Sequence, residues 1–328
     1  MSARVGIVGF RGYSGAELVR ILDRHAHVET VLMEHRSEAG ETDRPTIPCT
    51  PEAVQNEGLV LVFLATPAEV SMELAPAMLD AGVRVIDLSG AFRLRTVENY
   101  ARWYGAQHTS PQWLADAVYG LPEYFRNRIP GARLVANPGC YPTAANLAIR
   151  PLIDAGAIDR LAGIVCDAKS GVSGAGRKPS LKTSFCEVTE NFSAYSILNH
   201  RHVPEVLMTS GLDECEFSFT AQLIPIHRGI LETIYFRGKN LNSAEDIVAI
   251  YKERYKAEPF LRIHKAGNAP DLHAVAGTNF CDLGAVYDGR TGRAVVVAAI
   301  DNLTKGAASM AVQSMNLMLG FAETEALL

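Results

Sequence analysis

The sequence has no long apolar run, no surplus of positive charge and no fixed-period repeat. No stretch of about 18 apolar residues is present, so we expect no membrane-spanning helix. Lys and Arg number 31 against 36 Asp and Glu, for a net charge of −5. That balance does not draw the chain to nucleic acid or to anionic membranes, and neither is expected as a partner. Low-complexity segments are absent as well.

Cysteine is sparse and scattered. The six cysteines form no CxxC pair, which argues against a structural zinc site and against a disulfide scaffold, so no metal is expected. A reducing, cytoplasmic setting fits this usage. The first residues, MSARVGIVGF, enter a strand without an apolar secretory core or an Arg/Ser-rich transit stretch. We therefore expect a cytoplasmic protein.

What the chain does have is length and an ordinary globular composition. It comprises 328 residues, of which 48% are hydrophobic and 20% are charged. That length allows either two domains with sizeable cores or one large α/β domain.

A glycine loop follows the first apolar strand, which spans residues 4–8. The loop has the spacing GxxGxxG and leads into a helical apolar stripe, and residues 28–33 form a second strand. Glycines in such a turn let the backbone approach a pyrophosphate at the start of a helix, so we predict a dinucleotide site; a plain tight turn is the alternative. The candidate cofactor-binding residues here are Gly9, Gly12, Tyr13, Ser14 and Gly15.

The end of the second strand gives conflicting signals about the dinucleotide. Glu34 is suited to a ribose 2′-hydroxyl, as in NAD sites, whereas Arg36 and Ser37 are suited to the 2′-phosphate of NADP. A solvated charge cluster is the third interpretation.

Strands and helices alternate through the first 139 residues. This order predicts a doubly wound parallel sheet, an α/β fold of Rossmann type. Ligands in such sheets bind beyond the carboxyl ends of the strands, where we expect residues 66–67, 89–93 and 137–140 to converge. Arg93 is therefore a candidate clamp for a phosphate or carboxylate.

Cys140 lies on a predicted turn between a strand and a helix. The strand covers residues 134–136, Asn137 to Gly139 break it, and the pattern becomes helical from Tyr141. Backbone N–H groups and the helix dipole at such a position favour a thiolate and can stabilise an oxyanion. We predict that Cys140 is a nucleophile; a small buried cysteine that only packs is the alternative.

The segment His200-Arg201-His202-Val203-Pro204-Glu205 combines two imidazoles, a cation and a carboxylate. Such a set offers a general acid/base near neutral pH and a charge for an anionic ligand. Surface histidines without a role are the alternative. Zinc is not favoured, because no third His or Cys stands at ligand spacing.

The C-terminal half reads as strands with fewer helices. Residues 280–287 and 294–300 form a hairpin, which predicts an α+β domain with a mostly antiparallel sheet. A long helix follows in the last stretch, and we expect it to be buried. A thiolate and a nicotinamide together suit aldehyde or acyl chemistry, in which sulfur forms a thioester that hydride reduces.

The chain resembles the N-acetyl-gamma-glutamyl-phosphate reductases of arginine biosynthesis from about Val5 to its end. The motifs that carry the resemblance are GYSGAEL, DLSGAFRL, VYGLPE, ANPGCYPTA, DAKSGVSGAGRKPS, HRHVPE, RGILETIY, GTNFCDLG and AIDNLTKGAASMAVQSMNLM. The resemblance implies reduction of N-acetyl-glutamyl 5-phosphate to the 5-semialdehyde with release of phosphate. The implied cofactor is NADPH, with NAD(H) still open, and the implied assembly is a homodimer or homotetramer.

The same resemblance assigns roles to residues. Cys140 would be the nucleophile and His202 the acid/base group, with His200 beside it for substrate or proton transfer. Arg93 and Asn137 would hold the leaving phosphate. The remaining two implied roles are contact with the amino-acid end by Glu205 and contact with the nicotinamide by Asn302. The dinucleotide domain would span 1–139, completed by a C-terminal helix over 302–328, and the catalytic and oligomerisation domain would span 140–301.

Several positions depart from the family pattern. A small residue is usual where Arg11 stands, and Thr-Ser-Arg is usual where this chain has Glu34-His35-Arg36. Ala91 replaces an Asp, and Gln222 replaces a His. The rival assignments are the aminoadipyl-phosphate reductase of lysine biosynthesis and a cofactor-binding regulatory protein without catalysis.

Overall fold

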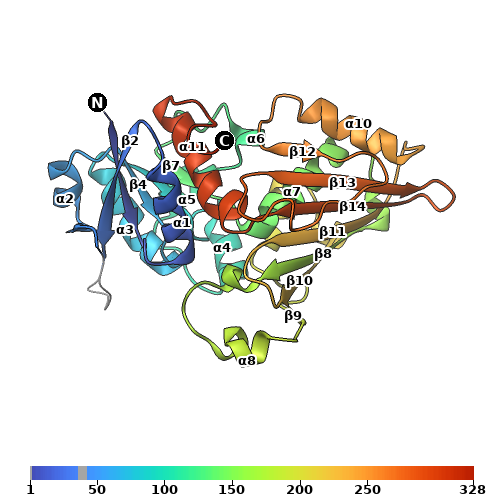
Figure 1. Cartoon of the computed structure of the whole chain (residues 1–328), viewed down its shortest axis with the longest axis horizontal. Coiled ribbons are helices and arrows are strands. Elements are labelled where there is room, and N and C mark those ends of the chain that lie inside the picture. The colour runs from blue at the N-terminus through green and yellow to red at the C-terminus, as the bar shows by residue number, and fades with distance from the viewer. Residues whose placement is uncertain (1, 36–42) are drawn as a thin grey trace. The chain divides into compact units, whose positions relative to one another are not determined.

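The computed structural model describes residues 2–35 and 43–328, which form two compact units. The first comprises Met1–Gly139 and Ala307–Leu328, and the second comprises Cys140–Gly306. Each unit has its own seven-stranded sheet (Figure 1). Across the described ranges, no helix has both the length and the apolar character needed to cross a membrane.

The first unit has a wholly parallel sheet in the order β3-β2-β1-β4-β5-β7-β6. The direction of strand addition reverses between β1 and β4, which makes this the switch point of the sheet. Its strands are β1 (Ala3–Val8), β2 (Val28–Glu34), β3 (Thr46–Pro48), β4 (Leu61–Leu64), β5 (Arg84–Asp87), β6 (Val118–Tyr119) and β7 (Leu134–Ala136). The predicted doubly wound fold is confirmed.

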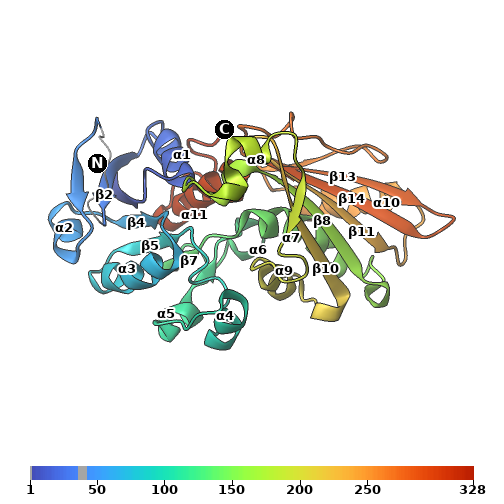
Figure 2. The same cartoon turned by 90° about the horizontal axis from the view of Figure 1, so that it is seen from below.

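Helices cover both faces of this sheet. Figure 2 shows α1 and α11 on one face and α3 on the other, so the central strands are buried on both sides. The helices are α1 (Tyr13–Leu22), α2 (Pro51–Asn56), α3 (Ala68–Asp80), α4 (Val97–Tyr104), α5 (Pro111–Asp116), α6 (Pro122–Phe125) and α11 (Ser309–Leu319). A buried bond between His25 Nε2 and Asn316 Oδ1, 3.0 Å long, ties the α1 end to α11.

The last helix is shorter than the predicted span of 302–328. A π-helical turn occupies Thr304–Ala308, and regular helix runs only over Ser309–Leu319. Asp301 causes the irregular start, because its carboxylate accepts the backbone N–H groups of Leu303 and Thr304. Gly320 ends the helix with a left-handed φ of 75°.

The second unit has a mixed, mostly antiparallel sheet in the order β12-β13-β14-β11-β8-β10-β9, as predicted. Its strands are β8 (Ile164–Gly171), β9 (Ser193–Tyr195), β10 (Phe217–Ile224), β11 (Ile230–Arg237), β12 (Leu261–Ile263), β13 (Cys281–Asp288) and β14 (Arg293–Ile300). Its helices are α7 (Cys140–Asp154), α8 (Phe185–Val188), α9 (Val203–Ser210) and α10 (Ala244–Arg254), with short 3-10 turns at Arg160–Ala162, Val172–Ala175, Leu181–Thr183 and Glu214–Glu216.

One face of this second sheet packs on helices and the other carries exposed apolar side chains. In β11, Ile234 is buried while the next residue, Tyr235, is 44% exposed. Tyr235 pairs in register with Val165 of β8 and Val295 of β14, and Val295 pairs with Val286 of β13. These four residues form a row across four strands, which we call the open-face row.

Candidate active site

The glycine loop between β1 and α1 depends on two residues that lack a side chain. Gly9 has φ +79°, and a Cβ there would lie 2.3 Å from the carbonyl oxygen of Ala65. A Cβ on Gly15 would lie 2.2 Å from the carbonyl oxygen of Gly9. Gly12 is the N-cap of α1, and Tyr13 and Ser14 begin the helix. The loop therefore presents unhindered backbone at a helix N-terminus, as a pyrophosphate requires.

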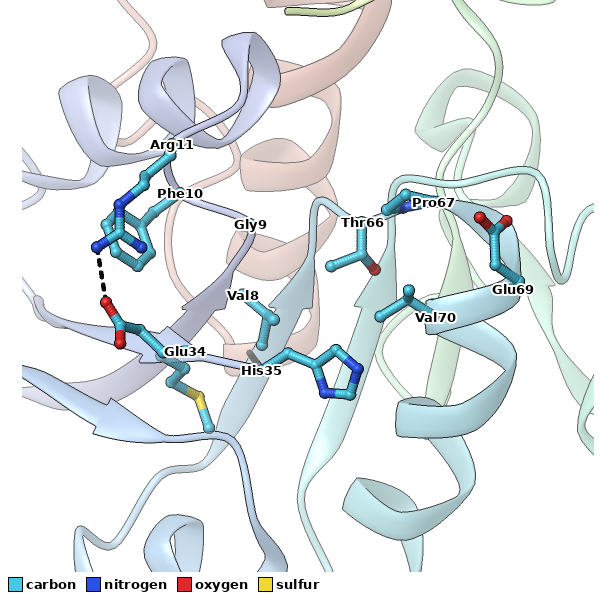
Figure 3. A pocket seen from close by; sticks show the side chains of 11 residues that line it. Val8, Gly9, Phe10, Arg11, Glu34, His35, Thr66, Pro67, Glu69 and Val70 are labelled. Atoms are coloured by element: carbon cyan, nitrogen blue, oxygen red, sulfur yellow. Dashed lines mark hydrogen bonds and ion pairs between the residues drawn. The ribbon is translucent and has the colours of Figure 1, made fainter. Parts of the chain in front are cut away.

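A pocket opens at the carboxyl ends of β1, β2 and β4, beside this loop (Figure 3). Its position at the switch point is where dinucleotides bind in doubly wound sheets. The lining residues are Val8, Gly9, Phe10, Arg11, Met33, Glu34, His35, Thr66, Pro67, Glu69 and Val70. The predicted cofactor residues Arg36 and Ser37 lie outside the described residues. The loop and pocket fit a nicotinamide dinucleotide.

Arg93 is buried in the segment that follows β5, and its guanidinium donates to two backbone carbonyl groups. Its Nε donates to the carbonyl oxygen of Asn137 at 2.8 Å, and its Nη2 donates to the carbonyl oxygen of Leu88 at 2.9 Å. Asn137 is buried too, and its side-chain amide donates to the carbonyl of Ala307 at 3.2 Å. The structure thus brings Arg93 and Asn137 together, and Asn137 lies on the turn that leads into Cys140. Their contact with phosphate remains a prediction.

Cys140 is the first residue of α7, as predicted from the Asn-Pro-Gly break. It is partly buried and forms no disulfide with another described residue. Gly306 of the π-helical turn lies against it: a Cβ added to Gly306 would stand 2.9 Å from the Cβ of Cys140. The turn before Cys140 and the glycine opposite it fix the backbone that carries the sulfur.

Four rings pack together beside this thiol. The centroids of His200 and His202 are 4.7 Å apart, and the ring of Tyr141 lies edge-on to both, at 5.5 and 5.9 Å. Tyr195 packs on His200 at 5.5 Å, and its hydroxyl lies 3.2 Å from that of Tyr141. Burial raises the pKa of both tyrosines, and the charge of the Cys140 thiolate raises both further. The phenols therefore stay protonated near the sulfur.

The two histidines differ in surroundings. His200 Nδ1 accepts the backbone N–H of His202 at 3.2 Å, so the neutral ring carries its proton on Nε2. Burial, reinforced by the positive charge of Arg201, lowers the pKa of His200 to about 4. His200 is therefore neutral at neutral pH. That state suits a positioning residue better than a proton donor.

Two further predicted residues are buried in the second unit. Glu205 is in the first turn of α9 and is fully buried. Asn302 Oδ1 accepts the backbone N–H of Gly229 at 2.7 Å, and its Nδ2 donates to Ser173 Oγ at 3.0 Å. Asn302 thereby links the small-residue loop after β8 to the turn before β11. Their contacts with substrate and nicotinamide remain predictions.

Comparison with known proteins identifies the family. A family described as "Semialdehyde dehydrogenase, NAD binding domain" matches residues 4–132, and one described as "Semialdehyde dehydrogenase, dimerisation domain" matches residues 140–302. An N-acetyl-gamma-glutamyl-phosphate reductase from Symbiobacterium thermophilum is 47% identical, covering 100% of this chain and 98% of that protein. One from Desulforudis audaxviator is also 47% identical, over 99% of this chain and 97% of its own. The chain belongs to the N-acetyl-gamma-glutamyl-phosphate reductase family.

Solved structures show that the fold of this reductase family member extends to distant relatives. Aspartate semialdehyde dehydrogenase II from Vibrio cholerae superposes with a TM-score of 0.75 at 18% identity, covering 98% of this chain and 99% of that one. An aspartate semialdehyde dehydrogenase with NADP from Candida albicans gives 0.68 at 14% identity, over 97% and 99%. At such identities the likeness establishes the fold alone.

Sequence reasoning missed Tyr195 and Gly306 in this member of the reductase family. Tyr195 lies on β9, 55 residues from Cys140, and nothing in its local pattern marks it as part of a site. Gly306 was hidden in an Ala-rich helical stretch. Within the described residues, no group of three or more His, Cys, Asp or Glu side chains is arranged to hold a metal ion.

Proposed function

We propose that this chain reduces N-acetyl-L-glutamyl 5-phosphate to N-acetyl-L-glutamate 5-semialdehyde, with release of phosphate, in arginine biosynthesis. The observation that carries the proposal is Cys140 at the first turn of α7 beside a cluster of two histidines and two tyrosines. Identity of 43–47% over nearly the whole chain to reductases of that name gives the substrate.

The reaction begins at sulfur. The Cys140 thiolate attacks the acyl carbon, the carbon–phosphate oxygen bond breaks, and a thioester replaces the acyl phosphate. Arg93 and Asn137 hold the leaving phosphate, and Glu205 helps to hold the amino-acid end. When bound, NADPH supplies the hydride that reduces the thioester.

His202 then moves the proton. It donates to the oxygen of the hemithioacetal, and it recovers a proton as the carbon–sulfur bond breaks to give the aldehyde and free Cys140. His200 accepts the backbone N–H of His202 and so fixes the backbone of His202, which is the residue at the N-cap position of α9. His202 is thus the acid/base group and His200 positions it.

The two units divide the work in this proposal. Residues 1–139, completed by the C-terminal helix, hold the dinucleotide through the loop of Gly9, Gly12 and Gly15. Residues 140–301 carry the chemistry, and Asn302 contacts the nicotinamide. NADPH is the proposed donor. The cradle at Gly9 and Gly15, which a Cβ would fill, supports a nicotinamide dinucleotide there.

We also propose that the chain assembles as a homodimer or homotetramer through the open-face row. Val165, Tyr235 and Val286 of that row, on β8, β11 and β13, are 44–47% exposed, an apolar surface that a second copy would cover. Light scattering of the wild type and of Tyr235→Glu tests this. A wild-type monomer at micromolar concentration contradicts it.

The activity is tested in the direction of semialdehyde oxidation. The chain is mixed with N-acetyl-glutamate 5-semialdehyde, phosphate and NADP or NAD, and absorbance of the reduced nicotinamide is followed. We expect a phosphate-dependent rise that Cys140→Ser abolishes. Cys186→Ser, which changes an exposed free thiol, is the matched control and retains the rate. No signal from folded wild type with either dinucleotide refutes the proposal.

A further inference from the structure

The pocket beside the glycine loop contains an ion pair at the end of β2. Arg11, from the loop, donates through Nη2 to Glu34 Oε1 at 2.6 Å (Figure 3). Glu34 is the last residue of β2. A carboxylate at that point, roughly 20 residues after the loop, binds the ribose 2′-hydroxyl in NAD sites of this fold. The guanidinium of Arg11 therefore lies within hydrogen-bond distance of the group that reads the 2′-position.

The geometry of Arg11 is defined by a second contact. Its guanidinium carbon lies 4.4 Å from the centroid of the Phe10 ring, which is itself buried. Stacking on an aromatic face keeps the planar guanidinium oriented and leaves its edge for oxygen ligands. The Arg11 and Glu34 side chains are 21% and 29% exposed, so the pair borders the pocket and is partly shielded from solvent.

The charges of the residues that line the pocket determine how a ribose 2′-phosphate could be accommodated. Glu34 and Glu69 both line the pocket, and among the described lining residues Arg11 alone carries a permanent positive charge. A ribose 2′-phosphate brought to Glu34 would meet like charge unless a cation accompanied it. A guanidinium can exchange a carboxylate for a phosphate because both accept its forked N–H groups in the same geometry.

We propose that Arg11 binds the 2′-phosphate of NADP(H) in exchange for Glu34, and that Glu34 accepts the 2′-hydroxyl of NAD(H), so that one ion pair admits both dinucleotides. This inference rests on the dinucleotide site of the proposed function and adds the residues that contact the 2′-position of either cofactor. A long side chain at the Arg11 position then supplies a phosphate contact and does not obstruct the site.

The test is binding of two probes that differ only by the 2′-phosphate, 2′,5′-ADP and 5′-AMP, measured by calorimetry without substrate. For Arg11→Gln we expect affinity for 2′,5′-ADP to fall about 10- to 100-fold, the effect of losing a hydrogen-bonded charge, with 5′-AMP unchanged. For Glu34→Gln we expect the opposite order: 2′,5′-ADP binds more tightly and 5′-AMP more weakly. Arg20→Gln, on α1 and paired with Glu17, is the matched control.

Several outcomes overturn the inference. Arg11→Gln that weakens both probes equally assigns Arg11 a general contact, and Arg11→Gln that changes neither removes it from the site. Loss of 2′,5′-ADP selectivity in Arg36→Gln alone transfers the role to Arg36, which lies outside the described residues. Wild type that binds neither probe refutes the dinucleotide site of the proposed function as well. Wild type and variants that bind the two probes as expected, in a protein without reductase activity, support the inference and refute the proposed reaction.

Discussion

Replacing His200 by asparagine should flatten the dependence of stability on pH. The His200 ring is 6% exposed and packs on Tyr141, Tyr195 and Phe219. Burial first, and then the charge of Arg201, lowers its pKa to about 4 from an unfolded value near 6.5. Asparagine places an oxygen near the position of Nδ1 and so can still accept the backbone N–H of His202, but it does not titrate.

The sign follows from proton uptake. Because the folded-state pKa of His200 is depressed, only the unfolded chain binds a proton between about pH 6.5 and pH 4, and unfolding is favoured as pH falls through that window. The stability is fully present above about pH 6.5. From the two pKa values, wild type should lose about 2 kcal/mol through His200 between pH 7 and pH 5.

The assay is urea unfolding at pH 7 and pH 5 for wild type, His200→Asn and His273→Asn, where His273 is an exposed control. Comparing each variant with wild type at both pH values cancels the contribution of other titrating groups. We expect His200→Asn to lose about 2 kcal/mol less than wild type over this range and the control to match wild type. Equal pH dependence in wild type and His200→Asn would refute the assignment of a neutral, buried His200.

Two further substitutions test the surroundings of the sulfur. Gly306→Ala places a Cβ 2.9 Å from that of Cys140, so the cysteine backbone must shift, and we expect kcat to fall about 100-fold. The control is Gly131→Ala, whose added Cβ enters open space and leaves the rate unchanged. An unchanged kcat in Gly306→Ala contradicts the close approach. Tyr195→Phe removes the hydroxyl 3.2 Å from that of Tyr141, and we expect urea unfolding to show a free energy of unfolding lower by about 1 kcal/mol, the effect of one hydrogen bond. An unchanged free energy of unfolding would show that the bond between the two hydroxyls contributes nothing to the cluster.

The features that sequence predicts here are those fixed by local pattern. The order strand, glycine loop, helix and strand sets the β1-α1-β2 unit, because apolar periodicity distinguishes its parts and glycine marks the turn. Asn137-Pro138-Gly139 interrupts an apolar run, and the structure begins α7 at Cys140 for that reason. Position after a strand likewise predicted that residues 89–93 and Asn137 converge, and Arg93 bonds to the carbonyl oxygen of Asn137.

The features that sequence could not predict depend on partners far along the chain. Nothing in the local sequence of Arg93 indicates that it donates to the carbonyl of Asn137, 44 residues away, a bond that exists because the carboxyl ends of β5 and β7 are neighbours in the sheet. The contact of Arg93 with an anion remains a prediction. Gly306 reads as one small residue in a helical stretch. Its need for a missing side chain arises only from the approach of Cys140.

The ion pair of Arg11 and Glu34 joins two residues whose relation the local sequence does not indicate. From sequence, Glu34 indicates NAD and Arg36 indicates NADP, and the conflict has no resolution within the segment. Because β1 and β2 pair in parallel, Glu34 at the end of β2 lies beside the glycine loop that follows β1. There Arg11 Nη2 donates to Glu34 Oε1 at 2.6 Å. Under the inference above, a 2′-phosphate would meet both charges of this pair. Arg11, which departs from the family pattern in the loop, would then compensate for Glu34, which departs from it at the end of the strand.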